Sequence, residues 1–166
     1  KVIMTTCSHD NPSVVEEAAS KFGSQSILAS IDCKKDLLGR RQAYVRSGRA
    51  KTGLSPWGHA VKCEAFGVGE LIVTSIDREG TYQGYDDELL AEVTSGVTVP
   101  VVANGAAAVI EDFRKAVVEG GCSAVAAGSM FVYSARGQGV LINYPSQEVL
   151  EGEFWNSLSG TAIQNS

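Results

Sequence analysis

Residues 71–86, LIVTSIDREGTYQGYD, decide the fold class of this chain. An apolar strand runs directly into an acidic, glycine-containing loop, and the loop opens a predicted helix. Two junctions of the same design follow at residues 99–106 (VPVVANGA) and 124–130 (AVAAGSM). Small residues at successive strand ends allow backbone N–H groups to approach an anion. The pattern therefore predicts a phosphate cradle at the carboxyl edge of a parallel sheet.

The rest of the chain repeats this alternation of strand and helix. Apolar runs predict strands at residues 2–4, 26–31, 70–75, 99–103 and 124–127, and helices are predicted near residues 12–22, 56–66, 86–94 and 110–120. A small hairpin is expected where residues 42–47 and 51–54 flank Gly48. Apolar strands joined through helices require a parallel sheet. A doubly wound open sheet and part of a (β/α)8 barrel both satisfy this α/β pattern.

Composition limits the classes of function. With 166 residues, 44% of them hydrophobic, the chain is long enough for one sizeable core. A net charge of -5 and scattered cations argue against a nucleic-acid partner or an anionic membrane. We find no apolar run of membrane-spanning length and no signal peptide in the sequence, so a soluble protein is expected. The four widely spaced cysteines indicate neither a zinc site nor a disulfide framework, which fits a cytoplasmic location.

The beginning of the chain indicates a fragment. The first residue is Lys1 rather than methionine, and residues 2–4 already have the character of a buried strand. We therefore expect that the chain starts inside a fold.

Five strings resemble one known family. ASIDCKK, SGRAKTG, GVGELIVTSIDREGTYQGYD, VPVVANGA and AVAAGSMF occur in an order and spacing similar to the cyclase subunit of imidazole glycerol phosphate synthase, a histidine-biosynthesis family. The resemblance covers roughly residues 1–134. It implies a (β/α)8 TIM barrel of which this chain covers about strands 4 to 8. Residues 1–146 would then form a partial barrel, and the Gly- and Ser-containing tail at residues 147–166 is expected to be loosely ordered.

The resemblance also implies an activity and a partner. Members of the family are lyases that take ammonia from a glutaminase subunit and use no cofactor. They convert a bis-phosphorylated aminoimidazole carboxamide ribotide to imidazole glycerol phosphate. Asp32 matches one of two catalytic aspartates that act as general acid and base, and the other belongs to a first strand that this chain lacks. From the residues alone, a cap of a helix or turn is an equal alternative for Asp32.

Phosphate contacts are the next implication of the resemblance. It nominates the residues that follow three strands: Gly80, Thr81, Asn104, Gly105, Ala106, Gly128 and Ser129. The family usually has Ser-Gly-Gly where this chain has Asn104-Gly105-Ala106, so a methyl group stands where backbone approaches the ligand. Asp77 is expected to position the substrate, with a purely structural role in the loop as the alternative.

Two further features lie elsewhere in the implied barrel. Thr5 and Thr6 stand where the family has an Asn-Thr pair at its second phosphate site. Cys7 follows them where the family tends to have alanine, and we interpret it as a small packing residue rather than a nucleophile. Lys1 and Glu70 match members of a charged ring that gates ammonia entry, with an ordinary surface ion pair as the alternative.

Two other interpretations remain open. Residues 140–146 (VLINYPS) resemble the ending of a cyclase-like branch that channels ammonia for sugar amidation in surface-polysaccharide (O-antigen) biosynthesis. The remaining possibility is a non-catalytic half barrel. Because five parallel strands cannot close such a barrel, we expect the chain to form homo-oligomers and to lack cyclase activity by itself.

Overall fold

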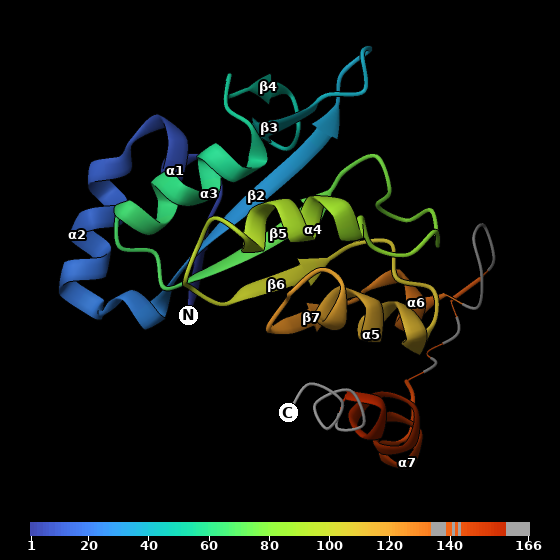
Figure 1. The fold of residues 1–166 in the computed structure, drawn as a ribbon. Coiled ribbons are helices and arrows are strands. Elements are labelled where there is room, and N and C mark those ends of the chain that lie inside the picture. Colours follow the sequence, from blue (N-terminus) through green and yellow to red (C-terminus); the bar gives the residue numbers. More distant parts are fainter. Residues whose placement is uncertain (134–138, 141, 143, 159–166) are drawn as a thin grey trace.

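The structure, a computed structural model, describes residues 1–133, 139–140, 142 and 144–158. Its centre is a twisted sheet of seven strands (Figure 1). Five strands run parallel in the spatial order β1 (Val2–Met4), β2 (Ile27–Lys35), β5 (Glu70–Ser75), β6 (Val101–Asn104) and β7 (Ala124–Ala126). The hairpin strands β3 (Arg41–Val45) and β4 (Ala50–Lys51) extend the sheet: β3 lies antiparallel to the second half of β2, and β4 lies antiparallel to β3. The expected α/β fold with a parallel sheet is confirmed.

Helices connect the parallel strands as the alternation predicts. The main helices are α2 (Pro12–Phe22), α3 (Pro56–Ala65), α4 (Asp87–Thr94) and α5 (Ile110–Val118). Short turns add α1 (Cys7–Asp10), η1 (Ser24–Ser26) and α6 (Ser129–Val132). Local signals set the ends: α3 has proline in its first turn, and the Ser55 hydroxyl accepts a hydrogen bond from the Gly58 N–H. α2 ends at Gly23, whose φ of 83° suits only glycine well.

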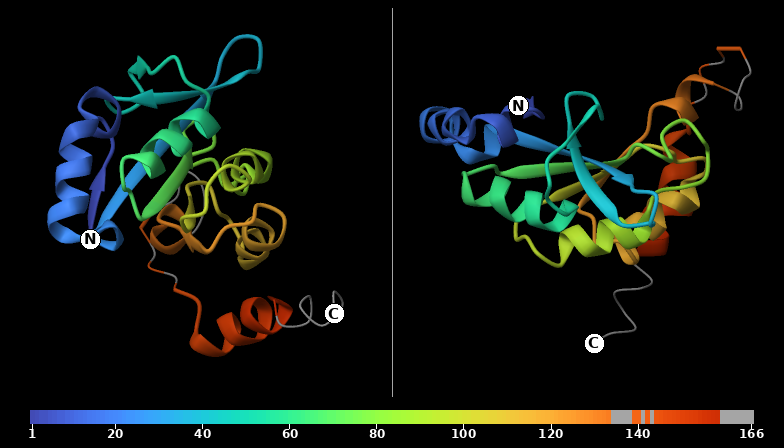
Figure 2. Two further views of the ribbon diagram at one scale, coloured as in Figure 1. Left: turned by 60° about the vertical axis from the view of Figure 1, so that its left-hand side comes forward. Right: turned by 90° about the horizontal axis from the view of Figure 1, so that it is seen from above.

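All four main helices cover the same face of the sheet (Figure 2). One hydrophobic core joins strand side chains to helix side chains; its members include Ile27, Ala29, Ile31, Leu71, Val73, Val101 and Ala103 from the strands and Val15, Ala60, Leu89 and Phe113 from the helices. A doubly wound sheet would have helices on both faces, whereas a barrel wall has them on one. The arrangement is consistent with the barrel family, although the sheet does not close among the described residues.

The other face of the sheet is left open. Strand side chains alternate between faces, so the registers Ile3–Leu28, Ser30–Ile72 and Ile72–Val102 place the apolar side chains of Ile3, Ile72 and Val102 on the face away from the helices. Ile3 is 56% exposed, and Ile72 and Val102 are half-buried. In a closed barrel these three side chains would face the interior.

Two expectations need correction. Residues 26–31 were expected to form the second strand, but β2 continues to Lys35 because its last four residues pair with β3. Asp32 therefore lies inside a strand and caps neither a helix nor a turn. The hairpin itself is confirmed, with strands at Arg41–Val45 and Ala50–Lys51 rather than 42–47 and 51–54.

The C-terminal tail contains helical turns that composition did not indicate. α7 (Gln147–Val149) leads into the π-helical turns of η2 (Leu150–Trp155). The Phe154 ring is buried and meets Phe113 of α5 edge-on, with 6.1 Å between ring centroids. Residues 134–138, 141, 143 and 159–166 lie outside the described residues, and they include part of VLINYPS. No helix in the described part is long and apolar enough to cross a membrane.

Candidate active site

A row of polar side chains crosses the open face near the carboxyl ends of the strands. Asp32 on β2 is in register with Thr74 on β5, and Thr74 is in register with Asn104 on β6. The Asn104 amide donates a hydrogen bond to the Thr74 hydroxyl over 2.9 Å. Because the three residues share a face and neighbour one another, the structure brings two predicted site residues, Asp32 and Asn104, into one row.

Asp32 has a fixed orientation within this row. The Ser30 hydroxyl, two residues earlier on the same face, donates to Asp32 Oδ1 over 2.9 Å. Across the hairpin Tyr44 pairs with Asp32, and the Lys34 ammonium lies 5.3 Å from the Tyr44 ring centroid. The carboxylate is half-buried and accessible from the open face. A group placed in this way is able to exchange a proton with a ligand on that face.

The loop after β5 is held by hydrogen bonds to its surroundings. Asp77 Oδ2 accepts from the Lys35 N–H over 2.7 Å, which ties the loop to the end of β2. Arg78 donates to the carbonyl of Tyr85, and the Thr81 hydroxyl donates to the carbonyl of Arg78. Gly80 has a φ of 70°, as such a tight turn requires. These contacts hold the loop in place, and the Asp77 carboxylate retains a second oxygen for a ligand.

Glu79 lies against the predicted phosphate cradle. Its carboxylate fills the space next to Gly105 that a side chain at position 105 would occupy. Gly105 has a φ of 87°, so glycine is favoured there for its conformation as well. A carboxylate repels a bound phosphate, so an anion at Gly105 requires Glu79 to move or to become neutral.

Ala106 carries a conformational strain. Its φ of 73° lies in the left-handed region that alanine adopts at a cost of about 1 kcal/mol. The carbonyl of Ala106 accepts from the Gly84 N–H over 3.0 Å, which helps to hold this geometry. The departure from the Ser-Gly-Gly pattern of the family thus changes both shape and backbone energy at this strand end.

The residues after β7 contact the same loop. Gly128 precedes α6, and the Tyr82 hydroxyl donates to the carbonyl of Ser129 over 3.0 Å. The Tyr85 hydroxyl donates to the carbonyl of Ala126, the last residue of β7. Both tyrosines thereby join the loop of residues 76–86 to the strand end that carries Gly128 and Ser129.

Thr5 and Thr6 follow β1, at the other edge of the parallel sheet. The carbonyl of Thr5 accepts from the Ser8 hydroxyl over 2.6 Å, and Thr6 Oγ1 accepts from the Arg46 N–H over 3.1 Å. Arg46 also pairs with Asp10 over 2.9 Å. The hairpin turn therefore packs directly on the predicted second phosphate site, and it occupies a lone pair of Thr6.

Lys1 and Glu70 lie at the opposite, amino-terminal edge of the sheet. Their side chains form an ion pair between β1 and β5, on the open face. The pairing agrees with their expected proximity. Lys1 is mostly exposed here, so the geometry fits either a gate or a surface ion pair.

Sequence reasoning missed several residues at this site. Ser30 precedes Asp32 by two, and strand alternation places such residues on the same face, but the predicted strand ended at residue 31, before Asp32. Glu79 and Tyr82 gave no sequence signal, because their roles depend on where the loop folds back onto β6 and β7.

The fold and the site define a parallel α/β protein with helices on one face of its sheet and polar loops at the carboxyl ends of its strands. Residues 1–136 match the family described as Histidine biosynthesis protein, and the chain belongs to that family.

Named relatives agree with the family. A putative imidazole glycerol phosphate synthase subunit HisF from Leptospira interrogans is 39% identical over 93% of this chain and 61% of its own length. The imidazole glycerol phosphate synthase subunit HisF of Alkaliphilus metalliredigens is 40% identical over 81% of this chain and 53% of its own length. A putative imidazole glycerol phosphate synthase subunit hisF2 from Pseudomonas aeruginosa is 39% identical over 91% of this chain and 60% of its own length. The chain thus spans little more than half the length of these relatives.

Proposed function

We propose that this chain forms part of the cyclase subunit of an imidazole glycerol phosphate synthase in histidine biosynthesis. The observation that carries the proposal is the row of Asp32, Thr74 and Asn104 at the strand ends of a family member. The substrate would be a bis-phosphorylated aminoimidazole carboxamide ribotide, and ammonia would be the second reactant. No cofactor takes part in this chemistry.

Asp32 is the residue that would transfer a proton. Its half-buried carboxylate is oriented by Ser30 and faces the open side of the sheet, where a substrate would bind. A positioned acid or base contributes a factor of about 10²–10⁴ to a reaction rate. The second acid or base would come from a segment that this chain does not contain, so we expect no cyclase activity from these residues alone.

The partner would be a glutaminase subunit that supplies ammonia. Its place would be at the amino-terminal edge of the sheet, where Lys1 and Glu70 pair on the open face. Ammonia entering there would travel along the open face toward Asp32, because Glu70 and Asp32 lie at opposite ends of neighbouring strands. The names of the relatives, which describe them as subunits, support an assembly of this kind.

A second candidate is an ammonia-channelling role in sugar amidation for surface-polysaccharide biosynthesis. Two observations favour it: the hairpin contact on Thr6 and the methyl group of Ala106 alter both predicted phosphate sites. A site that has lost its fit for a bis-phosphorylated ribotide would still conduct ammonia. Assaying the complete protein with that ribotide separates the candidates, because the channelling protein should not turn it over.

The catalytic assignment predicts the effect of Asp32→Asn. In a protein in which this chain is joined to the rest of a barrel, ammonia-dependent turnover should fall by about 10²–10⁴-fold with little change in folding. Asp36→Asn is the matched control, since Asp36 lies in the turn after the same strand and outside the polar row. Turnover close to normal in Asp32→Asn would contradict the assignment.

The anion site can be tested on the chain itself. Titration with inorganic phosphate should shift the backbone amide signals of Gly80, Gly105, Gly128 and Ser129 in ¹⁵N spectra. Glu79→Gln should tighten binding by roughly 3- to 30-fold, because it removes a negative charge next to Gly105.

Glu119→Gln, at the end of α5, is the control for a simple change in net charge. If phosphate shifts other residues, or if Glu79→Gln and Glu119→Gln behave alike, the proposed cradle is wrong.

A further inference from the structure

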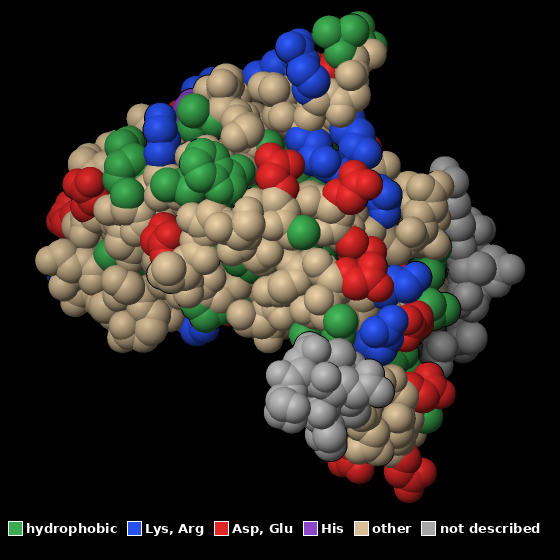
Figure 3. All heavy atoms as spheres, viewed as in Figure 1, with side chains coloured by type: hydrophobic (Ala, Val, Ile, Leu, Met, Phe, Trp, Pro, Cys, Tyr) green, Lys and Arg blue, Asp and Glu red, His purple; other side chains and the backbone are tan. Residues whose placement is uncertain are grey.

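A projecting arm carries two leucines into the solvent. It consists of the end of β2, the turn at residues 36–40 and the start of β3 (Figure 1). Leu37 and Leu38 are 105% and 77% exposed. Figure 3 shows hydrophobic side chains at the outer end of this arm, with Lys and Arg side chains next to them and along its base. Two adjacent leucines with this much exposure indicate a surface that another molecule covers.

The tip of the arm has a fixed shape. The Asp36 carboxylate accepts hydrogen bonds from the backbone N–H groups of Leu38 and Arg40, each over 2.9 Å, and from Nε of Arg40. The Gly39 N–H closes the turn by donating to the carbonyl of Asp36. Because the turn is held from within, the leucines cannot fold back onto the protein, and a partner meets them already oriented.

The arm and the rest of its hairpin are rich in cations in an otherwise acidic chain. Residues 34–51 contain seven of the 14 Lys and Arg residues but only one of the 19 Asp and Glu residues. Within the chain, Lys35 and Arg41 pair with Asp86, and the largely exposed Arg40 pairs with Asp36. The rest of the chain is therefore much more acidic than its net charge of -5 indicates. A partner surface for the arm should combine an apolar pocket with carboxylates.

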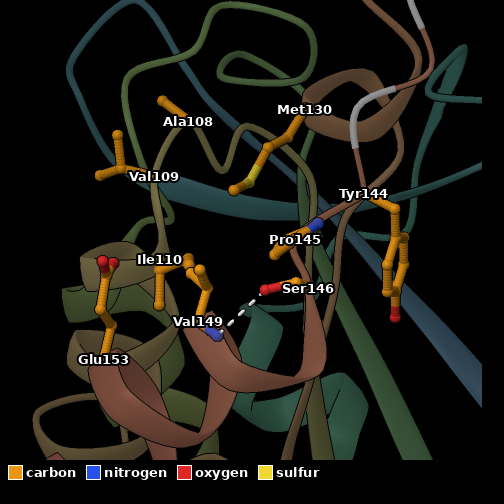
Figure 4. A pocket seen from close by; sticks show the side chains of 9 residues that line it. All are labelled: Ala108, Val109, Ile110, Met130, Tyr144, Pro145, Ser146, Val149 and Glu153. Carbon is orange, nitrogen blue, oxygen red and sulfur yellow. Dashed lines mark hydrogen bonds between the residues drawn. The ribbon is translucent and has the colours of Figure 1, made fainter.

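The same chain carries such a surface at its other end. A pocket of about 440 Å³ lies between the start of α5, α6 and the tail. Its walls combine polar groups, Ser146 and Glu153 among them, with the apolar side chains of Val109, Ile110, Met130, Tyr144 and Val149. Figure 4 shows the Glu153 carboxylate beside Val109 on one side of the pocket and Tyr144 across from it. Residues 147–158 contain three glutamates and no Lys or Arg.

We propose that the arm of one copy docks in this pocket of a second copy, with Leu37 and Leu38 against its apolar side chains and the arm cations near Glu153. In Figure 1 and in the left view of Figure 2 the arm and the tail lie at opposite ends of the molecule, so an arm does not reach its own pocket. The contact joins two different surfaces, and repeating it builds a row of copies. It does not depend on the proposed catalytic function.

Two variants disrupt the two docking surfaces one at a time. The arm variant, Leu37→Ser with Leu38→Ser, removes the apolar tip; the pocket variant, Val109→Lys, puts a cation where the basic arm would dock. All three positions are more than half exposed, so both variants should fold normally. Each variant alone should fail to associate through this contact. Mixed together, they should form one intact junction, because each supplies the surface that the other lacks.

The readout is the ¹⁵N spectrum of the labelled arm variant during addition of the unlabelled pocket variant. Amide shifts are expected at residues 108–110 and 144–149, saturating at roughly 0.1–1 mM because the contact is much smaller than a standard interface. Adding unlabelled arm variant instead should give no such shifts. Raising the salt from about 0.05 to 0.5 M should weaken the shifts several-fold. As a control, Phe22→Ser removes an exposed apolar side chain elsewhere. A pocket variant that also carries Phe22→Ser should still produce the same amide shifts in the labelled arm variant.

Two results would overturn the proposal. The first is a mixture that shows no shifts at the pocket, or shifts confined to β1 and β7. The second is that the unmodified chain binds vesicles of phosphatidylglycerol and the arm variant does not, while the amide signals of the pocket residues stay unshifted in the mixture. That outcome would mean that the arm inserts into an anionic lipid surface instead.

Discussion

His59 is a buried imidazole with no visible hydrogen-bond partner. It lies on the face of α3 that packs into the protein, is 1% exposed, and neither ring nitrogen has a partner among the described residues. The His9 ring contacts it edge-on, with 5.7 Å between the centroids. Burial lowers the pKa of His59 to about 4, with His9 and Lys62 contributing in the same direction. The imidazole is therefore neutral in the folded chain at pH 7.

This lowered pKa predicts how stability depends on pH. Between about pH 6.5 and pH 4 the unfolded chain binds a proton at His59 that the folded chain does not. The free energy of unfolding should thus be unaffected by His59 above pH 7 and fall by up to about 3 kcal/mol as the pH drops through that window. Urea denaturation at a series of pH values measures it.

The matched variants for His59 are a leucine replacement and a change at its neighbour. His59→Leu should remove most of this loss, while His9→Gln should keep most of it, because burial is the main cause of the shift. Equal pH dependence in the wild type and His59→Leu would show that His59 is not the titrating group.

At the scale of elements, one ion-pair network joins the hairpin to α4. Arg41 at the start of β3 donates to Asp86 over 2.9 Å and to Glu88 over 2.8 Å. Asp86 also accepts from the Leu89 N–H and so caps α4. Burial by itself would raise the pKa of Asp86, but the hydrogen bonds from Arg41 and Leu89 outweigh it and hold that pKa below its ordinary value. The network fixes the base of the arm.

Arg41→Met should therefore destabilise the chain more than a typical surface change. It leaves the nearly buried Asp86 carboxylate without its main partner, and we expect a loss of about 2–4 kcal/mol in urea unfolding at pH 7. The pKa of Asp86 should rise in the same variant. Arg40→Met is the control: its pair with Asp36 is exposed at the arm tip, where solvent screens the charges, so its loss should change stability little. Similar losses in both variants would argue against a special role for Arg41.

At the scale of the whole molecule, the parallel sheet has two free edges and one uncovered face. Among the described residues, β1 and β7 each pair with one parallel neighbour, and the face that carries Ile3, Ile72 and Val102 has no helix over it. Unpaired strand edges and exposed apolar side chains favour association with another chain.

We therefore predict that the isolated chain forms dimers or larger oligomers at micromolar concentrations through these edges and this face. Sedimentation velocity is the measurement, and Ile3→Lys should shift the distribution toward monomer because it places a charge on the exposed edge strand. Phe22→Ser, which changes an exposed residue on α2, should have little effect. A monomer throughout the micromolar range would contradict the prediction. The weaker contact between arm and pocket would add to this association only at higher concentration.

The sequence by itself determined the order and type of most elements. Alternating apolar runs and helical stretches identified the five parallel strands, the four main helices and the hairpin, because these patterns depend on residues close in sequence. The motifs around Asp32 and the loop after β5 also identified the family. The registers then placed Asp32 beside Thr74, and Thr74 beside Asn104.

Only the tertiary structure decided which segments distant in sequence lie together. Packing between separate elements places the four main helices on one face, Glu79 on Gly105 and Phe154 on Phe113. It also buries His59 with no hydrogen-bond partner among the described residues. β2 continues through Asp32 to Lys35 for the same reason, since the partner strand that extends it comes from a hairpin formed later in the chain. Local sequence patterns record propensity and periodicity, whereas these contacts are set by how the whole core packs.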